Sequence, residues 1–163
     1  MAEVQTLFVK FDGIKGTSTV QGYTDYIAID SMHFSTLLGL QANATETLVS
    51  TGISLSTISF TKVDDYYSDE CLNLNMTNNT PYKHVTFVKV TTHAGKAVEN
   101  KKIIFSDVYV TSAETSLMND SAAVNYYILA ATQIQRESYA VNVNGNAEKV
   151  GPSTFNTVTG RVS

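Results

Sequence analysis

Hydrophobic residues along this chain alternate with polar ones far more often than they recur at helical spacing. Leu7, Val9 and Phe11 begin the pattern, and residues 139–143 repeat it cleanly near the other end. Alternation sends every second side chain to the same face of a strand, so it predicts half-buried strands. Roughly eight to ten strands joined by short turns are expected, which is typical of a β-barrel or a β-sandwich.

The strands between these two ends are less regular. They are expected at 23–30, 32–38, 53–63, 85–90, 103–110, 124–134 and 155–158. The segment 103–110 is hydrophobic on both faces, which predicts a central place in a sheet. Polar connections are expected at 93–100 and 111–121. Asn144-Gly145 is the strongest hairpin signal, with a returning strand that ends near Pro152.

Two stretches break the simple alternation. In a regular strand, Ile53 and Leu55 would point to one face, and Ile58 and Phe60 would point to the other. A bulge, or burial on both faces, would explain this change. The stretch from Thr36 to Gly52 is rich in Thr, Ser, Asn and Gly. These are turn and strand residues, so a long loop or hairpin is favoured there over a short helix.

A single helix is predicted, from Ser68 to about Met76. Ser68 suits an N-cap, and Asp69 and Glu70 would lie in the first turn, where the helix dipole favours negative charge. Leu72 and Met76 are four residues apart, as on one helical face. The same residues also alternate with Asn73 and Asn75, so a strand is the alternative for this stretch.

Composition narrows the class of protein. The chain has 163 residues, which suits one domain spanning 1–163 with a real core. Charged residues make up only 16%, and Ser, Thr and Asn supply much of the polarity. The net charge is −4 with no basic run, which argues against nucleic acid as a partner. Cys71 is the one cysteine, so no intrachain disulfide and no cysteine-based metal site is expected.

The sequence contains no motif that predicts an active site. It has no G-x-S-x-G turn, no P-loop and no G-x-G-x-x-G. The three histidines have no zinc-site spacing: His33, His84 and His93. The acidic residues of 64–70 lack the ligand spacing and glycine of a calcium loop. We therefore expect no catalytic residue, no cofactor and no metal. A convergence of His, Ser and Asp in the fold would be needed to indicate an enzyme.

No targeting segment is visible. The first apolar run, Leu7 to Phe11, is short and interrupted by Lys10, unlike the core of a signal peptide. No segment is long enough to cross a membrane. The expectation is synthesis in the cytoplasm and, if the protein is exported, a route that reads no cleavable signal.

Several stretches, in order, resemble the haemolysin-coregulated proteins (Hcp), the tube subunits of bacterial type VI secretion systems. The first is LFVKFDGIKGTSTVQGYTDYIAID, and the second is TISFTKVDDYYSDECLNLNM, a strand with a basic end, an acidic turn and the helix. YKHVTFVKV, KKIIFSDVYVTSAETS and NVNGNAEKVGPSTFNTVTGRV are similar to later strands. The chain departs from the family at Thr77-Asn78-Asn79, where a small residue and Gly are usual, and at Phe155, which is often Trp.

The resemblance implies a two-sheet antiparallel β-barrel with one flanking helix and no catalytic activity. Six copies would form a ring around a channel, and rings would stack into a tube. The partners implied are further copies of the chain, a contractile sheath, tube-tip proteins and small effector proteins in the channel. The stretch 36–52 is expected to contact a neighbouring subunit, through the candidate residues Leu37, Leu40, Thr45, Leu48 and Thr51. Ser68, Asp69 and Glu70 would cap the helix.

Two other interpretations stay open from the sequence. A tail-tube protein of a phage or related contractile particle would share this architecture. A β-sandwich adhesin or ligand-binding module belongs to a different class, and it would normally carry a signal peptide.

Overall fold

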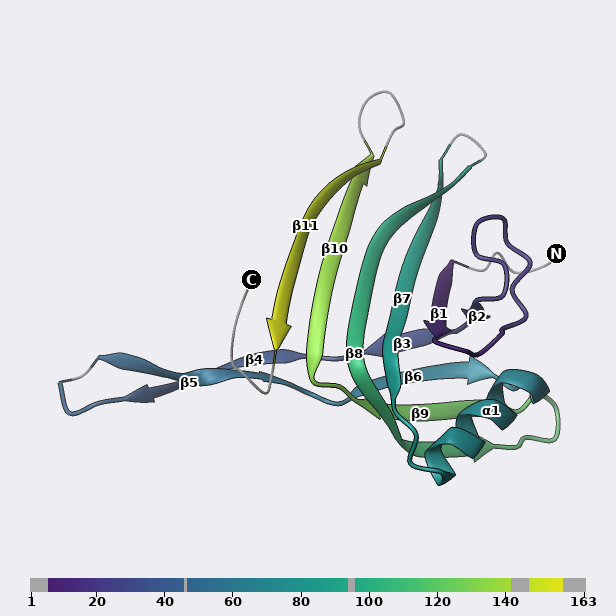
Figure 1. Cartoon of the computed structure of the whole chain (residues 1–163), viewed down its shortest axis with the longest axis horizontal. Helices are drawn as coiled ribbons and strands as arrows, with labels where there is room; N and C mark the ends of the chain where they lie inside the picture. Colours follow the sequence, from purple (N-terminus) through teal and green to yellow (C-terminus); the bar gives the residue numbers. More distant parts are fainter. Residues whose placement is uncertain (1–5, 46, 94–95, 142–146, 157–163) are drawn as a thin grey trace.

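The computed structural model describes residues 6–45, 47–93, 96–141 and 147–156, and it is mainly β (Figure 1). The elements in chain order are β1 (Leu7–Phe11), β2 (Ile27–Ala28), β3 (Ser31–His33), β4 (Thr36–Ala42), β5 (Leu48–Leu55), β6 (Ile58–Val63), α1 (Tyr66–Thr77), β7 (Tyr82–His93), β8 (Lys96–Ser116), β9 (Val124–Ala130), β10 (Gln133–Val141) and β11 (Ala147–Asn156). The predicted fold class, two antiparallel sheets with one flanking helix, is confirmed.

The two sheets share one long strand. β8 pairs with β7 and β10 along its first part, in a sheet that also contains β1, β2 and β11. Its last part pairs with β9, in a second sheet with β6 and β3. Figure 1 shows the first sheet standing upright and the second lying across its lower end. The prediction that 103–110 is a central segment is confirmed.

A bend at Asp107 lets β8 pass from one sheet to the other. Asp107 has a φ of 52°, a left-handed conformation that a residue other than glycine adopts at some cost. The Thr132 hydroxyl donates to the Ser106 carbonyl at 3.3 Å and to the Asp107 carboxylate at 3.2 Å, which secures the bend. The predicted polar loop 111–121 is wrong in its first half, because β8 continues to Ser116. Its residues are polar because this end of the strand is largely exposed.

The main core lies between the two sheets, with a row of aromatic rings at its centre. Phe60 lies 5.1 Å from Tyr127 and 5.9 Å from Phe87, and Phe87 lies 5.8 Å from Phe105, between ring centroids. These four side chains are almost fully buried. Burying each contributes about 1.5–3 kcal/mol, so this row is a large part of what holds the sheets together.

A smaller cluster covers the other face of the first sheet. The segment 12–26 crosses that face and stacks Tyr23 on Phe8 at 5.3 Å, above Val88 and Val90. Gly16 allows the close approach, because a Cβ there would lie 2.3 Å from the Tyr26 carbonyl oxygen. The predicted strand 23–30 therefore shortens to β2, since most of this segment turns over the sheet. Ile27 and Ile29 are both buried, as their shared parity predicted.

Several predicted strands are divided because the chain changes sheets. The parity change after Leu55 is neither a bulge nor two-face burial: the chain leaves the β4–β5 pair at Ser56 and enters the second sheet at Ile58. Predicted strands 32–38 and 124–134 divide for the same reason. The tail forms one strand through Pro152 rather than two, and Val158 and the Asn144-Gly145 turn lie outside the described residues. β10 and β11, on either side of that turn, pair as a hairpin predicts.

The helix is real but begins two residues before Ser68 and ends at Thr77. Among its described side chains, Asp69 and Leu72 are buried and Met76 is partly buried against the core, and α1 packs against β8. Asn79 follows the helix with a φ of 56°, and its amide donates to the Met76 carbonyl at 3.1 Å. Asparagine tolerates this left-handed position better than most residues, so it can end the helix where the resemblance led us to expect glycine.

Candidate functional site

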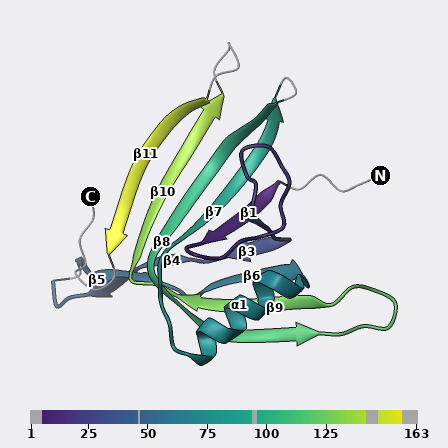
Figure 2. The ribbon, with the colours of Figure 1, turned by 45° about the vertical axis from the view of Figure 1, so that its right-hand side comes forward.

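β4 and β5 form a separate two-stranded sheet, here called the arm, that extends away from the rest of the molecule (Figures 1 and 2). The sequence favoured a loop or hairpin here, and a hairpin forms. Leu37 and Leu40 lie on β4, Leu48 and Thr51 on β5, and Thr45 in the turn between them. Leu37, Leu40 and Leu48 are exposed by 61%, 54% and 69%. Of the ten large hydrophobic side chains that the structure describes as exposed, six lie on the arm.

A bulge gives the arm one predominantly apolar face. Leu38 lies opposite Ile53, and Ala42 lies opposite Leu48, but the register shifts between Gly39 and Leu40. Leu48 and Ile53 are an odd number of residues apart, so a regular strand would place them on opposite faces. The extra residue brings Leu48 and Ile53 to the same face, together with Leu38 and Leu40. Gly52 lies at the bulge with a φ of 115°, a conformation that favours glycine.

The turn of the arm is organised by one side chain. The Asn43 carboxamide oxygen accepts hydrogen bonds from the Thr45 and Thr47 amides at 3.0 and 3.1 Å. It also accepts from both threonine hydroxyls at 2.8 Å. Thr45, one of the predicted contact residues, therefore helps to shape the turn.

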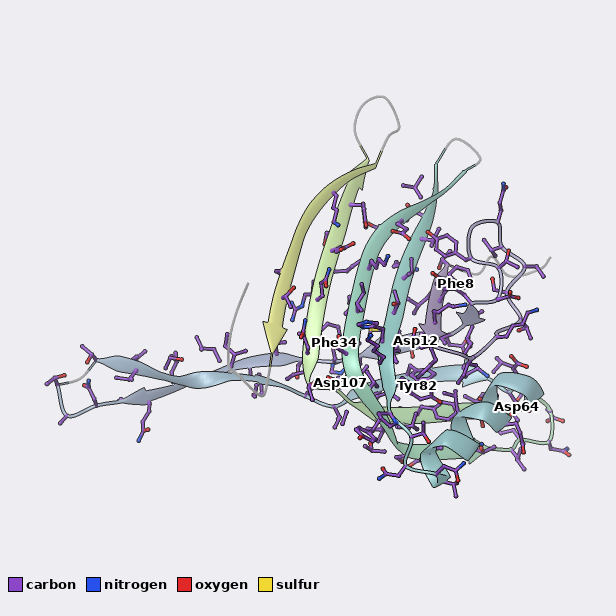
Figure 3. The ribbon with its side chains drawn as sticks, viewed as in Figure 1. Phe8, Asp12, Phe34, Asp64, Tyr82 and Asp107 are labelled. Atoms are coloured by element: carbon purple, nitrogen blue, oxygen red, sulfur yellow. The ribbon has the colours of Figure 1, made fainter. Side chains whose placement is uncertain are left out.

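The root of the arm is fastened to the first sheet. The Arg136 guanidinium of β10 lies 5.3 Å from the centre of the Phe34 ring and donates to the Thr36 hydroxyl at 2.9 Å. Phe34 in turn packs edge-on against Phe105 of the core at 5.4 Å (Figure 3). The arm therefore leaves the molecule from a fixed base in a defined direction.

A buried polar cluster attaches α1 to the second sheet. The Lys62 ammonium lies 2.7 Å from an Asp69 carboxylate oxygen, with the two side chains only 1% and 7% exposed. The same oxygen accepts the Asp65 amide, and the other accepts the Tyr127 hydroxyl. Burial and the Asp69 hydrogen bond raise the pKa of Tyr127, so its hydroxyl stays a donor. The charges of Lys62 and Asp69 are thus satisfied inside the protein.

The three residues predicted to cap the helix, Ser68, Asp69 and Glu70, have other roles in the structure. Asp65 precedes the helix, and the Asp69 amide makes the first helical hydrogen bond to the Asp65 carbonyl at 3.0 Å. Ser68 and Glu70 lie within the first turns, and Glu70 is exposed. Asp69 does not only place negative charge near the N-terminus of the helix dipole, because its carboxylate also joins the helix to β6 and β9. Asp64 is bound to the Asn125 side chain at 2.8 Å, beside the start of α1 (Figure 3).

A second polar network lies on the face of the first sheet away from the main core. The Glu137 carboxylate is 3.0 Å from the Lys149 ammonium and accepts the Tyr139 hydroxyl at 2.8 Å. Burial alone would raise the pKa of Glu137, but the bonds from Lys149 and Tyr139 outweigh it and lower the pKa below its usual value. Burial and the Glu137 bond raise the pKa of Tyr139 to about 12.

A histidine, a serine and an aspartate do come together, but without the geometry of a catalytic triad. His84 Nδ1 lies 3.4 Å from the Ser106 hydroxyl across β7 and β8. The Asp12 carboxylate accepts the backbone amide of His84 at 3.0 Å rather than a ring nitrogen. Within the described ranges, no three His, Cys, Asp or Glu side chains are grouped to hold a metal ion.

These features define a class of protein: a mainly β subunit that carries an exposed, preformed apolar hairpin. A family model described as "Type VI secretion system effector, Hcp" matches residues 8–144. The chain therefore belongs to the Hcp family of type VI secretion systems, a family of secreted structural proteins, and it is a tube subunit. A search of curated proteins found no match.

Solved structures agree on the fold. A structure described as a type six secretion system protein is 18% identical, with a TM-score of 0.88 over 98% of this chain and 100% of its own. Hcp1 from Salmonella typhimurium is also 18% identical, with a TM-score of 0.77 over 97% and 98%. A type VI secretion system effector from Yersinia pestis is 18% identical, with a TM-score of 0.68 over 92% and 98%.

Sequence reasoning did not anticipate the burial of Lys62 and Asp69. A signal for Lys62 was present, because it shares the parity of the buried residues Ile58 and Phe60. Its partner could not be predicted from the local sequence, since Asp69 comes from the helix and also accepts the Tyr127 hydroxyl of β9. The exposed residues Leu117 and Met118 were also missed, inside a segment interpreted as an ordinary polar loop.

Proposed function

We propose that the protein works by assembly: copies join head to tail into hexameric rings, and the rings stack into a tube with a central channel. The observation that carries this proposal is the arm. Six large hydrophobic side chains are exposed there: Leu37, Leu38, Leu40, Leu48, Val49 and Ile53. An apolar patch on a preformed element favours a protein partner, and in a tube subunit the nearest partner is another copy.

The predicted contact residues Leu37, Leu40, Thr45, Leu48 and Thr51 are assigned to this interface. Leu40 and Leu48 would contribute apolar area on the richer face, and Leu37 would contribute on the other. Thr45 supports the turn that holds the strands together. The interface belongs to a single domain spanning 1–163.

The further partners in this proposal are a contractile sheath around the tube, tube-tip proteins, and small effector proteins in the channel. Synthesis in the bacterial cytoplasm and export without a cleavable signal are part of the same proposal. No catalytic activity is assigned, because assembly is the mechanism. No helix in the described part of the chain is long and apolar enough to span a membrane.

The test is a mass measurement in solution combined with negative-stain imaging over a range of concentrations. Rings of about six copies with an open centre are expected, as for a closed head-to-tail assembly. A protein that stays monomeric at high concentration, with no rings on the grid, would contradict the proposal.

A further inference from the structure

We propose that the arm of one copy packs its apolar face against a second patch at the opposite end of the next copy. This patch, here called the end patch, consists of Val63, Leu117 and Met118. The inference rests on the proposed function and specifies which surface of the neighbour receives the arm.

The first argument is the distribution of exposed hydrophobic residues. Ten large ones are exposed in the described chain: Leu37, Leu38, Leu40, Leu48, Val49, Ile53, Val63, Tyr109, Leu117 and Met118. Six of these belong to the arm and three to the end patch, so among the side chains whose exposure is described only Tyr109 lies elsewhere. Leu117 is the most open of all, at 81%. Among the described side chains, the clusters of exposed hydrophobic residues thus lie in two places.

The second argument is that the end patch lies at one end of an ordered sheet. Val63 at the end of β6 lies opposite Val124 of β9, and Val124 lies opposite Ser116 at the end of β8. Leu117 and Met118 follow Ser116 directly, so they emerge at the same end of the second sheet as Val63, with β9 between them. The Asp64 amide donates to the Ala123 carbonyl at 2.8 Å, which holds the returning loop against β6. The patch therefore has a fixed position relative to the second sheet.

The third argument is geometric. Figures 1 and 2 show the arm at one end of the molecule and the loop between β8 and β9 at the other. One chain cannot cover its own end patch with its own arm. Contact between two arms would cover the arms and leave both end patches in water. Arm-to-patch contact in head-to-tail order covers both and repeats from copy to copy, as a ring or tube requires.

Cysteine cross-linking tests the contact in the full chain. Cys71→Ser supplies a background without thiols, since the chain has one cysteine. Leu48→Cys on the arm and Met118→Cys in the end patch are then combined in one chain and treated with a short bis-maleimide. A ladder beyond dimer is expected, because each copy joins two neighbours. Each single variant should give no ladder.

The matched control uses the other face of the same arm. Ser54 is exposed and pairs with Leu37, so it faces away from Leu38 and Ile53. Ser54→Cys with Met118→Cys should therefore give at least fivefold less cross-linked product than Leu48→Cys with Met118→Cys. Circular dichroism should be the same for all variants, so that differences report contact and not folding.

The outcomes separate this inference from the proposed function. Rings on the grid without a Leu48–Met118 ladder would overturn the inference and leave the tube function standing. Dimers from Leu48→Cys alone, or a ladder that stops at dimer in the double variant, would overturn it too, since they indicate a closed two-fold contact. Neither rings nor ladder would overturn both.

Discussion

The body of this protein and its arm are built from the same kind of strand, yet they treat hydrophobic residues in opposite ways. The body buries its apolar faces between two sheets and even encloses Lys62 and Asp69. The arm holds Leu48 and Leu38 in water. The alternation of hydrophobic and polar residues decides that a segment forms a strand. Burial of its hydrophobic side chains also needs another surface to pack against, and the same chain does not supply one for the arm.

The two regions also hold their shape by different means. Packing holds the body, through the aromatic row and the polar cluster beneath α1. Local hydrogen bonding holds the arm, through the Asn43 turn, the bulge at Gly52 and the Arg136 contact at its root. The arm is therefore shaped before it meets a partner, which lowers the ordering cost of binding. The variants below test this division in order of expected effect on stability.

The largest effect is expected from Asp69→Ala. It leaves the Lys62 ammonium buried without its carboxylate, which should lower the free energy of unfolding by about 3–5 kcal/mol. Urea unfolding followed by circular dichroism measures this. Lys62→Met combined with Asp69→Leu should recover much of the loss, because no buried charge remains. Equal losses in the single and double variants would show that helix docking does not depend on charge pairing.

A smaller effect is expected from Gly16→Ala. The new methyl group would lie 2.3 Å from the Tyr26 carbonyl oxygen and 2.7 Å from the Ile27 amide nitrogen. The segment 12–26 must then shift off the first sheet, at about 1–3 kcal/mol, typical of overpacking. Thermal unfolding with Thr17→Ala, an exposed neighbour, as the control would measure it. Matching melting temperatures for both variants would contradict the close approach.

The Glu137 network should make a modest, pH-dependent contribution. Because Lys149 and Tyr139 lower the pKa of Glu137, its stabilisation is complete at neutral pH and is lost as the pH falls through and below the usual glutamate range. The effect should be no more than about 1 kcal/mol, since the Lys149 side chain is 46% exposed. Unfolding midpoints of wild type and Glu137→Gln should converge at low pH. A constant difference at every pH would argue against the ion pair.

The smallest effect on stability is expected from the arm. Leu48→Asn should change the free energy of unfolding of the monomer by less than about 0.5 kcal/mol, since the side chain is exposed. The same substitution should reduce ring formation strongly in mass measurements. Ser54→Asn, on the other face, should leave assembly nearly unchanged. A large loss of monomer stability from Leu48→Asn would remove the distinction between arm and body.

Local patterns in the sequence were sufficient for much of the fold. The alternation around Val9 and Phe87 predicted strands, the apolar run 103–110 predicted the central strand, and the region near Ser68 predicted the one helix. The turn-rich stretch 36–52 favoured a long loop or a hairpin, and the order of the segments predicted the Hcp family. The strands, the helix and the turn-rich stretch depend on residues that are close together in the sequence, so they can be predicted from the sequence alone.

Tertiary structure alone decided where each strand belongs and which side chains meet. The sequence cannot show where the chain leaves one sheet for another, as it does at Ser56 and Asp107. The change depends on which strands pair with the chain before and after each of these residues. It cannot show that Lys62 and Tyr127 both bind Asp69, because the three residues come from three elements. Nor can it tell the buried alternation of β6 from the exposed alternation of β4. That difference depends on whether another surface lies opposite, and for the arm we place that surface on the next copy.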